Sequence, residues 1–264
     1  MSAAADAVIL EITEGVATIT LNRPQVSNAL ARDSYGEIKQ AVRELESDPQ
    51  VGVIVITGAG KHFSAGGDIQ RFKMLIDSGE FLSEEGVANA GAMTRSIRFC
   101  SKPVVAMVNG VATGAGLSLA LACDFRVMAP DSKMIMGFIK MGLPGDTGSI
   151  YFLSRLIGVE KASKMMMTGE IVAGEEAVQI GLATLLSQGS LEDAAYGFAE
   201  TLAAMPAAAI AKQKEMLAKY FYSGLDDYFV DEKQAMAECS RGPDFKEAVY
   251  AFLDKRTPSF NQPK

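Results

Sequence analysis

Residues 103–123 form a run of 21 residues without a single charged side chain. A segment this long and apolar has to be withdrawn from water, either across a membrane or inside a protein core. A membrane-spanning helix needs about 20 continuous, strongly apolar residues, but Asn109-Gly110 and the triplet Gly-Ala-Gly at 114–116 interrupt this run. The segment therefore predicts a buried strand, a glycine-rich turn over 109–116 and a short helix of small residues.

The same association of apolar strands, glycine-rich turns and helices recurs along the chain. Residues 51–57 (VGVIVIT) are continuously apolar, as expected for a parallel strand covered on both faces, and the turn 58–68 (GAGKHFSAGGD) follows them. A third glycine-rich turn, 142–149 (GLPGDTGS), precedes a further apolar helix. The other predicted elements are a hairpin of strands 8–12 and 16–21, a helix over 27–45, a largely helical segment over 69–100, and strands at 104–108 and 125–129.

Beyond about residue 190 the strand pattern ends. Four amphipathic helices are predicted there, at 191–204, 206–222, 225–239 and 243–255. We therefore expect an α/β fold with a core domain over residues 1–190 and a helical C-terminal domain over 191–264.

Charge and reactive side chains exclude several classes of function. Lys and Arg number 25 and Asp and Glu 32, a net charge of −7, which disfavours nucleic acids and anionic membranes as partners. Cys100, Cys123 and Cys239 lack metal-site spacing and favour a reducing, cytoplasmic location. The single histidine, His62, excludes multi-histidine metal sites, so no metal is expected. The N-terminus carries Asp6 and no basic stretch, so no secretion signal is expected.

Glycine-rich turns let backbone N–H groups approach a ligand closely. None of these turns matches the phosphate-binding pattern GxxxxGKS/T or a strand-linked GxGxxG. Two interpretations stay open. Each turn is only a tight turn, or two of them donate N–H bonds to one oxygen, as an oxyanion hole for a thioester or ester carbonyl that becomes an enolate.

Five motifs in series carry a resemblance to a known family: LNRPQVSNAL (21–30), HFSAGGDI (62–69), NGVATGAGLSLALACDFRVMA (109–129), MGLPGDTGSIYFLSRLIG (141–158) and FLDKRTPSF (252–260). Together they resemble the crotonase superfamily, also called the enoyl-CoA hydratase/isomerase family. The resemblance implies a crotonase-like spiral of ββα units with a helical C-terminal trimerisation domain, assembled as a homotrimer or a dimer of trimers. It also implies an acyl-CoA substrate, with coenzyme A as part of the substrate and no further cofactor, in fatty acid metabolism.

By position in these motifs, the resemblance places the family's two oxyanion-hole amides on Gly67 and Ala115. It places the adenine pocket at the backbone of Ala65, Gly67 and Ile69, and a lysine that reaches the nucleotide end of coenzyme A on Lys255. The expected substrate-binding residues are, in full, Gln25, Val26, Ala65, Gly66, Ile69, Gly114, Ser118, Phe138 and Lys255.

Two positions depart from the family's coenzyme A contacts, because Gln25 and Gln70 stand where lysines are common. The positive charges of Arg23, Lys61 and Arg71 lie close in the sequence and are candidates to replace them.

The catalytic positions depart further. Family hydratases hold and activate water with two glutamates, but the matching positions here are Ser118 and Phe138. An isolated hydroxyl titrates far above neutral pH, and a phenyl ring does not titrate. A third acidic position, used by isomerases of dienoyl- or ring-derived acyl-CoAs, falls on Asp146. Asp146 is interpreted either as a catalytic base or as an N-cap of the following helix, with Glu84 and Glu85 as the next candidates for a base.

The sequence therefore predicts an acyl-CoA enzyme in which Gly67 and Ala115 form the oxyanion hole and Asp146 carries protons. An enoyl-CoA double-bond isomerase is favoured, resembling the phenylacetate-pathway, dienoyl-CoA or Δ3,Δ2-enoyl-CoA type. The alternatives are an enoyl-CoA hydratase, a thioester hydrolase or C–C lyase, and a non-catalytic acyl-CoA-binding protein. Asp68 and Asp124 are expected to be structural carboxylates.

Overall fold

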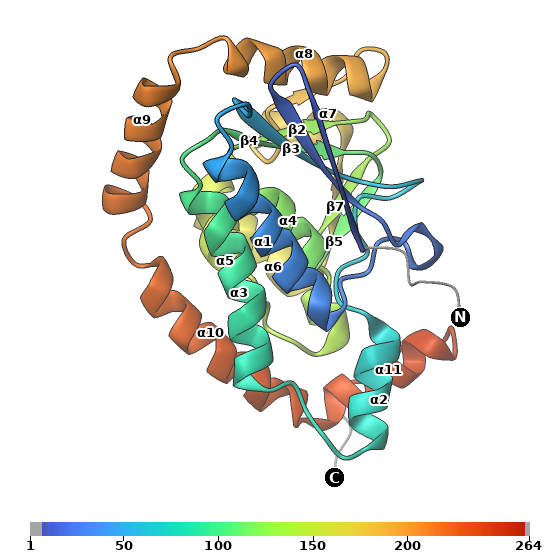
Figure 1. Ribbon diagram of the computed structural model, residues 1–264. Helices are drawn as coiled ribbons and strands as arrows, with labels where there is room; N and C mark the ends of the chain where they lie inside the picture. Colours follow the sequence, from blue (N-terminus) through green and yellow to red (C-terminus); the bar gives the residue numbers. More distant parts are fainter. Residues whose placement is uncertain (1–6, 262–264) are drawn as a thin grey trace, which may run out of the picture.

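The computed structural model describes residues 7–261 and arranges them as two β-sheets surrounded by helices (Figure 1). Residues 1–6 and 262–264 lie outside the described part. The expectation that the N-terminus is not a secretion signal therefore falls partly on residues that are not described. The strands are β1 Val8–Thr13, β2 Val16–Leu21, β3 Val53–Gly58, β4 Val104–Val108, β5 Val111–Thr113, β6 Phe125–Met128, β7 Lys133–Ile135, β8 Ile171–Ala173 and β9 Leu185–Leu186. The α-helices are α1 Arg32–Ser47, α2 Ile69–Asp77, α3 Glu84–Phe99, α4 Ala115–Ala122, α5 Ser149–Ile157, α6 Val159–Thr168, α7 Gly174–Gln179, α8 Leu191–Ala203, α9 Ala207–Tyr220, α10 Leu225–Ser240 and α11 Pro243–Leu253. Short 3-10 helices lie at Pro24–Val26 and Gly137–Met141.

From β4 to β7 successive strands alternate between the two sheets. The larger sheet has the order β1-β2-β3-β4-β6-β9, in which β1 is antiparallel to β2 and the other neighbours are parallel. The smaller sheet has the order β5-β7-β8. The chain passes from β4 to β5 and then into α4, and from β6 to β7 before the next helical turns. Each passage forms one ββα unit. The sequence patterns did not predict β5 or β7, because each has only three residues.

The central strands are covered on both faces, as their continuous apolar runs predicted. Every residue of β3 and of β4 is buried. Ile54 and Ile56 belong to the main core, which residues of α1 and α3 also line. Val53 and Val55 belong to a second cluster with Leu191 of α8. A buried apolar residue contributes about 1.5–3 kcal/mol, so these two layers fix the sheet from both sides.

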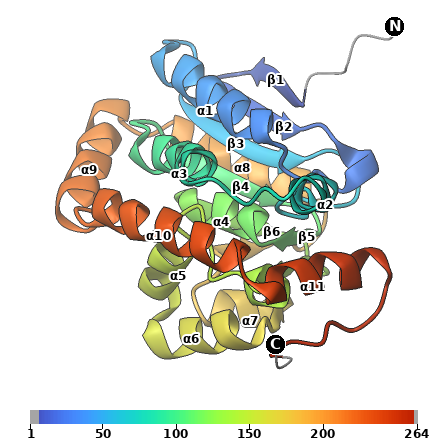
Figure 2. The ribbon, with the colours of Figure 1, turned by 90° about the horizontal axis from the view of Figure 1, so that it is seen from below.

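The C-terminal helices lie where the four amphipathic patterns predicted them, but they pack on different parts of the molecule. α8 packs against β2, β3 and β4, whereas α10 packs on α3 and α11 on α2. Figure 2 shows α10 beside α3 and α11 beside α2 on the underside of the molecule. The division of the chain at residue 190 stays a prediction, and the packing of α8 places it in the covering layer of the sheet.

The predicted helix over 27–45 is wrong at its start, because α1 begins at Arg32. Asn28 has a left-handed φ of 54°, which an α-helix of L-residues does not accommodate. Its side-chain amide donates to the carbonyl oxygens of Ala59 and His62, at 2.9 and 2.7 Å. The residues before α1 thus hold the glycine-rich turn that follows β3.

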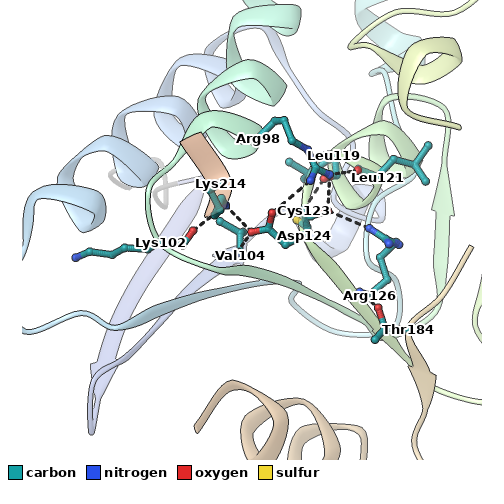
Figure 3. Close-up of polar contacts among 10 residues, drawn as sticks. All are labelled: Arg98, Lys102, Val104, Leu119, Leu121, Cys123, Asp124, Arg126, Thr184 and Lys214. Atoms are coloured by element: carbon teal, nitrogen blue, oxygen red, sulfur yellow. Dashed lines mark hydrogen bonds and ion pairs between the residues drawn. The ribbon is translucent and has the colours of Figure 1, made fainter. Parts of the chain in front are cut away.

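A buried cluster of charged side chains ties the C-terminal helices to the core (Figure 3). Asp124, just before β6, accepts from the N–H of Val104 at 2.8 Å. Its carboxylate pairs with Arg98 of α3 at 3.3 Å and with Lys214 of α9 at 2.5 Å. One carboxylate therefore connects three segments, which is the structural role expected for Asp124.

Two arginines also neutralise the C-terminal end of α4 (Figure 3). Arg98 donates to the carbonyl oxygens of Leu121 and Cys123, at 2.8 and 2.7 Å, and Arg126 donates to that of Cys123 at 3.0 Å. Cations at the C-terminal end of a helix interact favourably with its dipole. The two guanidinium groups thus bind the C-terminal end of α4. Neither of them interacts with the N–H groups at its N-terminal end.

Within residues 7–261 no single helix is long and apolar enough to span a membrane, and the α8–α9 pair that passes by length and composition is bent by 99°. The thiols of Cys100, Cys123 and Cys239 are free, and the first two are buried. The cytoplasmic location stays a prediction.

Replacing Asp124 tests the buried cluster. Asp124→Ala leaves Arg98 and Lys214, whose side chains are 7% and 9% exposed, without their shared carboxylate. Removing one partner of a buried ion pair costs about 3–5 kcal/mol, so we expect the free energy of unfolding in urea to fall by about that amount. The control is Asp226→Ala, which breaks an exposed pair with Arg95 and should cost about 0–1 kcal/mol. Equal losses in the two variants would contradict the role assigned to Asp124.

Candidate active site

A cavity of about 540 Å³ lies where the three glycine-rich turns meet. Gly67, Ala115 and Asp146, one from each turn, line it. Apolar side chains from distant segments complete much of the wall: Phe72 of α2, Leu82, Val87 of α3, Leu143, Met236 of α10 and Leu253 of α11. α10 packs on α3, and α11 packs on α2 (Figure 2). The C-terminal helices therefore complete the cavity wall together with α2 and α3.

The first two glycine turns touch each other through their backbones. Gly66 has a φ of +80°, and a Cβ built there would lie 2.5 Å from the carbonyl oxygen of Thr113 and 3.3 Å from the nitrogen of Ala115. Only glycine fits such a contact with both its conformation and its space. Ser64 accepts from the N–H of Thr113 at 3.1 Å and donates its own N–H to Val111 at 3.0 Å. These contacts bring Gly67 and Ala115 to the same cavity.

Ala115 is the first residue of α4, so its N–H has no acceptor inside the helix. Gly114 precedes it with a φ of +53° and gives α4 no side-chain cap. A helix N-terminus carries a partial positive charge and favours an anion. The N-terminal end of α4 thus offers an amide and a favourable field to an oxygen that gains negative charge in the cavity.

The two positions at which the resemblance expects glutamates have different surroundings. Phe138 lines the cavity, and its ring lies beside Gly114 and Gly145. Ser118 is fully buried in α4 and is not a wall residue. Its hydroxyl lies within donating distance of two carbonyl oxygens, at 3.2 Å from that of Gly114 and 3.3 Å from that of Asp146. Ser118 therefore links the glycine-rich turn 109–116 to the turn 142–149 that carries Asp146.

The carboxyl group of Asp146 does not cap α5. The N-cap residue of α5 is Gly148, without a side-chain cap, and Asp146 accepts the N–H of Ser149 only through its backbone carbonyl, at 3.1 Å. The Asp146 carboxylate instead accepts from the hydroxyl of Thr147 at 3.1 Å and faces the cavity. The N-cap interpretation of its side chain is therefore wrong.

The apolar surroundings change the acidity of Asp146. Burial raises its pKa to about 6, against the lowering effects of the Thr147 hydroxyl and the positive charge of Arg71. Tyr35 and Arg71 line the same cavity, and burial and the charge of Asp146 raise the pKa of Tyr35. A carboxyl group with a pKa near 6 is ionised at neutral pH and still regains a proton readily, which suits a general acid and base.

The sequence patterns did not identify a second carboxyl group at the site, that of Glu232. It belongs to α10, is 5% exposed, and both its oxygens lie within 3.2 Å of the nitrogen of Gly148. A signal for it exists: Leu225, Glu232 and Met236 are spaced to share one face of the helix, and all three are buried. A lone acid on an apolar helix face indicates a buried partner.

The remaining expected substrate-binding residues divide between the cavity and its surroundings. Those on the wall are Val26, Ala65, Ile69 and Gly114. Gly66 is buried behind the wall, and Gln25 and Lys255 are exposed outside it. The binding roles of all these residues stay predictions.

Of the other acidic side chains, Glu84 and Glu85 lie off the cavity wall, whereas Asp68 borders the cavity. Glu84 and Glu85 are exposed at the start of α3, and Glu84 pairs with Lys233 at 3.6 Å. Asp68 caps α2 by accepting the N–H of Gln70 at 3.1 Å and pairs with Arg23 at 3.0 Å. The structural role expected for Asp68 is thus present, although Asp68 also borders the cavity.

Comparison with known proteins agrees with this geometry. The family model for enoyl-CoA hydratase/isomerase matches residues 11–263. The short-chain-enoyl-CoA hydratase of Clostridium acetobutylicum is 32% identical over 94% of this chain and 95% of its own length. The 1,2-epoxyphenylacetyl-CoA isomerase of Escherichia coli K12 is 30% identical over 96% of this chain and 97% of its own.

A solved structure extends the likeness to three dimensions. The crystal structure of an enoyl-CoA hydratase from Mycobacterium avium subsp. paratuberculosis K-10 matches with a TM-score of 0.88 and 30% identity, over 97% of this chain and 99% of that one. The α/β fold of ββα units with C-terminal helices, which the sequence resemblance implied, is confirmed.

Proposed function

Because the chain belongs to the enoyl-CoA hydratase/isomerase family, we propose that it is an acyl-CoA double-bond isomerase with Asp146 as its general acid and base. The observation that carries the proposal is the position of Asp146 in an apolar cavity that Gly67 and Ala115 also line. Ser118 and Phe138 occupy the positions of the family's water-activating glutamates. One carboxyl group is enough to move a proton between two carbons.

The proposed reaction needs no group beyond those on the cavity wall. The N–H groups of Gly67 and Ala115 donate to the thioester oxygen, and the positive end of α4 stabilises the enolate that forms. Asp146 takes a proton from one carbon of the acyl chain, and the electron pair of that C–H bond forms the new double bond of the dienolate. The protonated Asp146 returns the proton to another carbon, so the double bond moves and no atom is gained or lost.

Hydration is the second candidate, and the similarity to the Clostridium acetobutylicum hydratase supports it. Adding water requires a group that holds the water and a group that protonates the neighbouring carbon. Phe138 offers neither, and the Ser118 hydroxyl is engaged with carbonyl oxygens below the wall. Asp146 would have to perform both tasks alone, so we favour isomerisation.

The cavity rim supports a proposed position for coenzyme A. Val26, Ala65 and Ile69 stand on the same wall as Gly67, so the thioester can reach the amides from this side. Arg71 also lines the cavity and is the candidate that replaces the family's lysines in this region. The exposed Lys255 lies just beyond α11, and its proposed contact with the nucleotide end of coenzyme A is, by resemblance to the family, one that often comes from a neighbouring subunit.

We propose a homotrimer or a dimer of trimers, supported by the surface of α9. This helix has no buried residue and stands at the edge of the molecule (Figure 1). Met216, Leu217 and Tyr220 on it are 50–73% exposed, and Phe221 follows them. Contiguous apolar surface of this kind is typical of subunit interfaces.

The assay that tests the proposed function is a panel of enoyl-CoAs incubated in deuterated water and analysed by mass spectrometry. Deuterium uptake at the acyl chain without gain of water indicates an isomerase, and gain of water indicates a hydratase. Release of free coenzyme A indicates a hydrolase, and binding without conversion indicates a binding protein.

Asp146→Asn keeps the size of the side chain but cannot accept a proton. A general base typically contributes 10²–10⁴-fold, so we expect deuterium uptake to fall by about that factor while acyl-CoA affinity stays close to wild type. Uptake at the wild-type rate would show that Asp146 is not the base.

The same variant has a stability signature. The raised pKa of Asp146 means that the folded protein holds this proton more tightly than the unfolded chain. Wild type should therefore lose stability relative to Asp146→Asn as the pH rises from about 4 to 6, measured by urea unfolding.

Ala115→Pro removes one proposed oxyanion donor with little change to α4, because proline is well tolerated at the first position of a helix. Loss of one such donor typically costs about 10²–10³ in rate, and we expect a loss of this size in deuterium uptake. Ala115→Gly, which keeps the N–H, should stay within about tenfold of wild type. If both variants are equally active and folded, the carbonyl does not bind at Ala115.

Light scattering tests the assembly. We expect a mass of three or six times 28.1 kDa for wild type and a smaller species for the double variant Met216→Lys and Leu217→Lys, which places two charges on the exposed face of α9. Lys212→Ala, also on α9, should leave the mass unchanged. A wild-type mass of 28.1 kDa at micromolar concentration would contradict the trimer.

A further inference from the structure

Glu232 of α10 is a buried acid for which the proposed reaction has no direct use. Its two carboxyl oxygens lie 2.9 and 3.2 Å from the nitrogen of Gly148. The N–H of Thr147 and the hydroxyl of Tyr228 are near enough to lower the pKa of Glu232. One side chain from the C-terminal helices thus binds the amide of Gly148, in the turn that carries Asp146.

That turn needs an external partner to keep its shape. Gly145, Thr147 and Gly148 all have positive φ angles, of 131°, 58° and 76°. A β-branched residue such as Thr147 is strained in this region, and such strain persists only where the surroundings enforce it. The hydroxyl of Thr147 lies 2.6 Å from the backbone carbonyl oxygen of Asp146 and 3.1 Å from its carboxylate, so Thr147 contacts Asp146 at both groups. The direction of the Asp146 carboxylate therefore depends on what holds Thr147 and Gly148.

We propose that Glu232 is the positioning residue of Asp146: it fixes the turn 145–148 and stays protonated while Asp146 is ionised, so that the pair holds a single negative charge. The inference rests on the proposed role of Asp146 as the base.

Two buried carboxyl groups whose charges interact do not readily both ionise at neutral pH, because each charge raises the free energy of the other. Burial and the negative charge of Asp146 raise the pKa of Glu232 to about 9, although the amides of Gly148 and Thr147 and the hydroxyl of Tyr228 lower it. The pKa of Asp146 is about 6. The pKa of Glu232 is raised further than that of Asp146, so Asp146 is the group that gives up its proton first.

The other charged groups around α10 are engaged or turned to solvent. Asp146 is the titratable group whose charge acts on Glu232, and Tyr228 acts on it through its hydroxyl. Burial raises the pKa of Tyr228, so Tyr228 stays protonated and uncharged. On α3 and α11 the pairs are Glu84 with Lys233, Arg95 with Asp226, Arg98 with Asp124 and Glu247 with Arg256, and Asp244 accepts from Asn261. The residues that are exposed instead are Glu85, Asp227, Asp231, Glu238 and Lys246.

The test compares Glu232→Gln, Glu232→Leu and, as matched control, the exposed neighbour Asp231→Asn. Glu232→Gln imitates the protonated acid, so we expect the acid limb of its pH–rate profile to stay near pH 6. We expect wild type to show a second, alkaline inflection near pH 9 from the ionisation of Glu232, and this inflection should be absent from Glu232→Gln. Glu232→Leu removes the acceptor of the turn, and we expect kcat to fall about 10- to 100-fold with KM little changed, as for a small misplacement of a reacting group. Asp231→Asn should match wild type throughout.

Two results would overturn the proposal. A wild-type kcat in folded Glu232→Leu would show that the turn does not need Glu232. An acid limb that moves down by one pH unit or more in Glu232→Gln would show that Glu232 is ionised beside Asp146.

Infrared difference spectra at pH 7.5 give a readout independent of activity. The absorption of a protonated carboxyl group should be present in wild type and in Asp146→Asn, and absent in Glu232→Gln. Its absence from wild type would overturn the inference. Full activity of Asp146→Asn with this absorption retained would instead overturn the proposed function alone.

Discussion

The structure depends on a backbone contact between two glycine-rich turns. At Gly66 a Cβ would stand 2.5 Å from the carbonyl oxygen of Thr113, and at Gly116 one would stand 2.6 Å from that of Ser64. Because neither side chain exists, the segment after β3 lies directly on the segment between β4 and α4. The neighbouring parallel strands β3 and β4 bring the two segments to the same edge of the sheet. The apolar layers on both sides of the sheet then hold this contact in place.

The contact places the two ends of α4 in opposite electrostatic environments. All eight residues of α4 are buried, so its end charges are weakly screened by water. Arg98 and Arg126 bind the carbonyl groups at its C-terminal end, while Ala115 at its N-terminal end lines the cavity. The positive end of the α4 dipole therefore faces the cavity before any substrate enters. Asp146 lines the same cavity, and Glu232 binds the amide of Gly148 in the turn that carries Asp146.

Much of this organisation was predictable from the sequence because it depends on local patterns. The apolar runs predicted buried strands, the periodicity beyond residue 190 predicted four helices, and the motifs placed Gly67, Ala115 and Asp146, which the fold brings to one cavity. The start of α1 was not predictable, because Asn28 is held by residues of a later turn. The position of Glu232 was not predictable either, since its partner Gly148 is 84 residues away and only tertiary packing joins them.

The groups proposed to hold the substrate carbonyl belong to the main chain, and this has a consequence for how such a protein changes over evolutionary time. A substitution at position 115 replaces a side chain and, unless it introduces proline, leaves the amide present. At position 67 a substitution also leaves the amide present, but its Cβ would lie 2.5 Å from the ring of Phe72, which would have to move. Positions 118, 138 and 146, by contrast, contribute side chains, and each can be exchanged by a single mutation. The proposed enolate-binding amides can thus be inherited unchanged while the side chains proposed to act on the enolate are replaced one at a time. Such a separation of main-chain donors from replaceable side chains allows different reactions to arise within one fold.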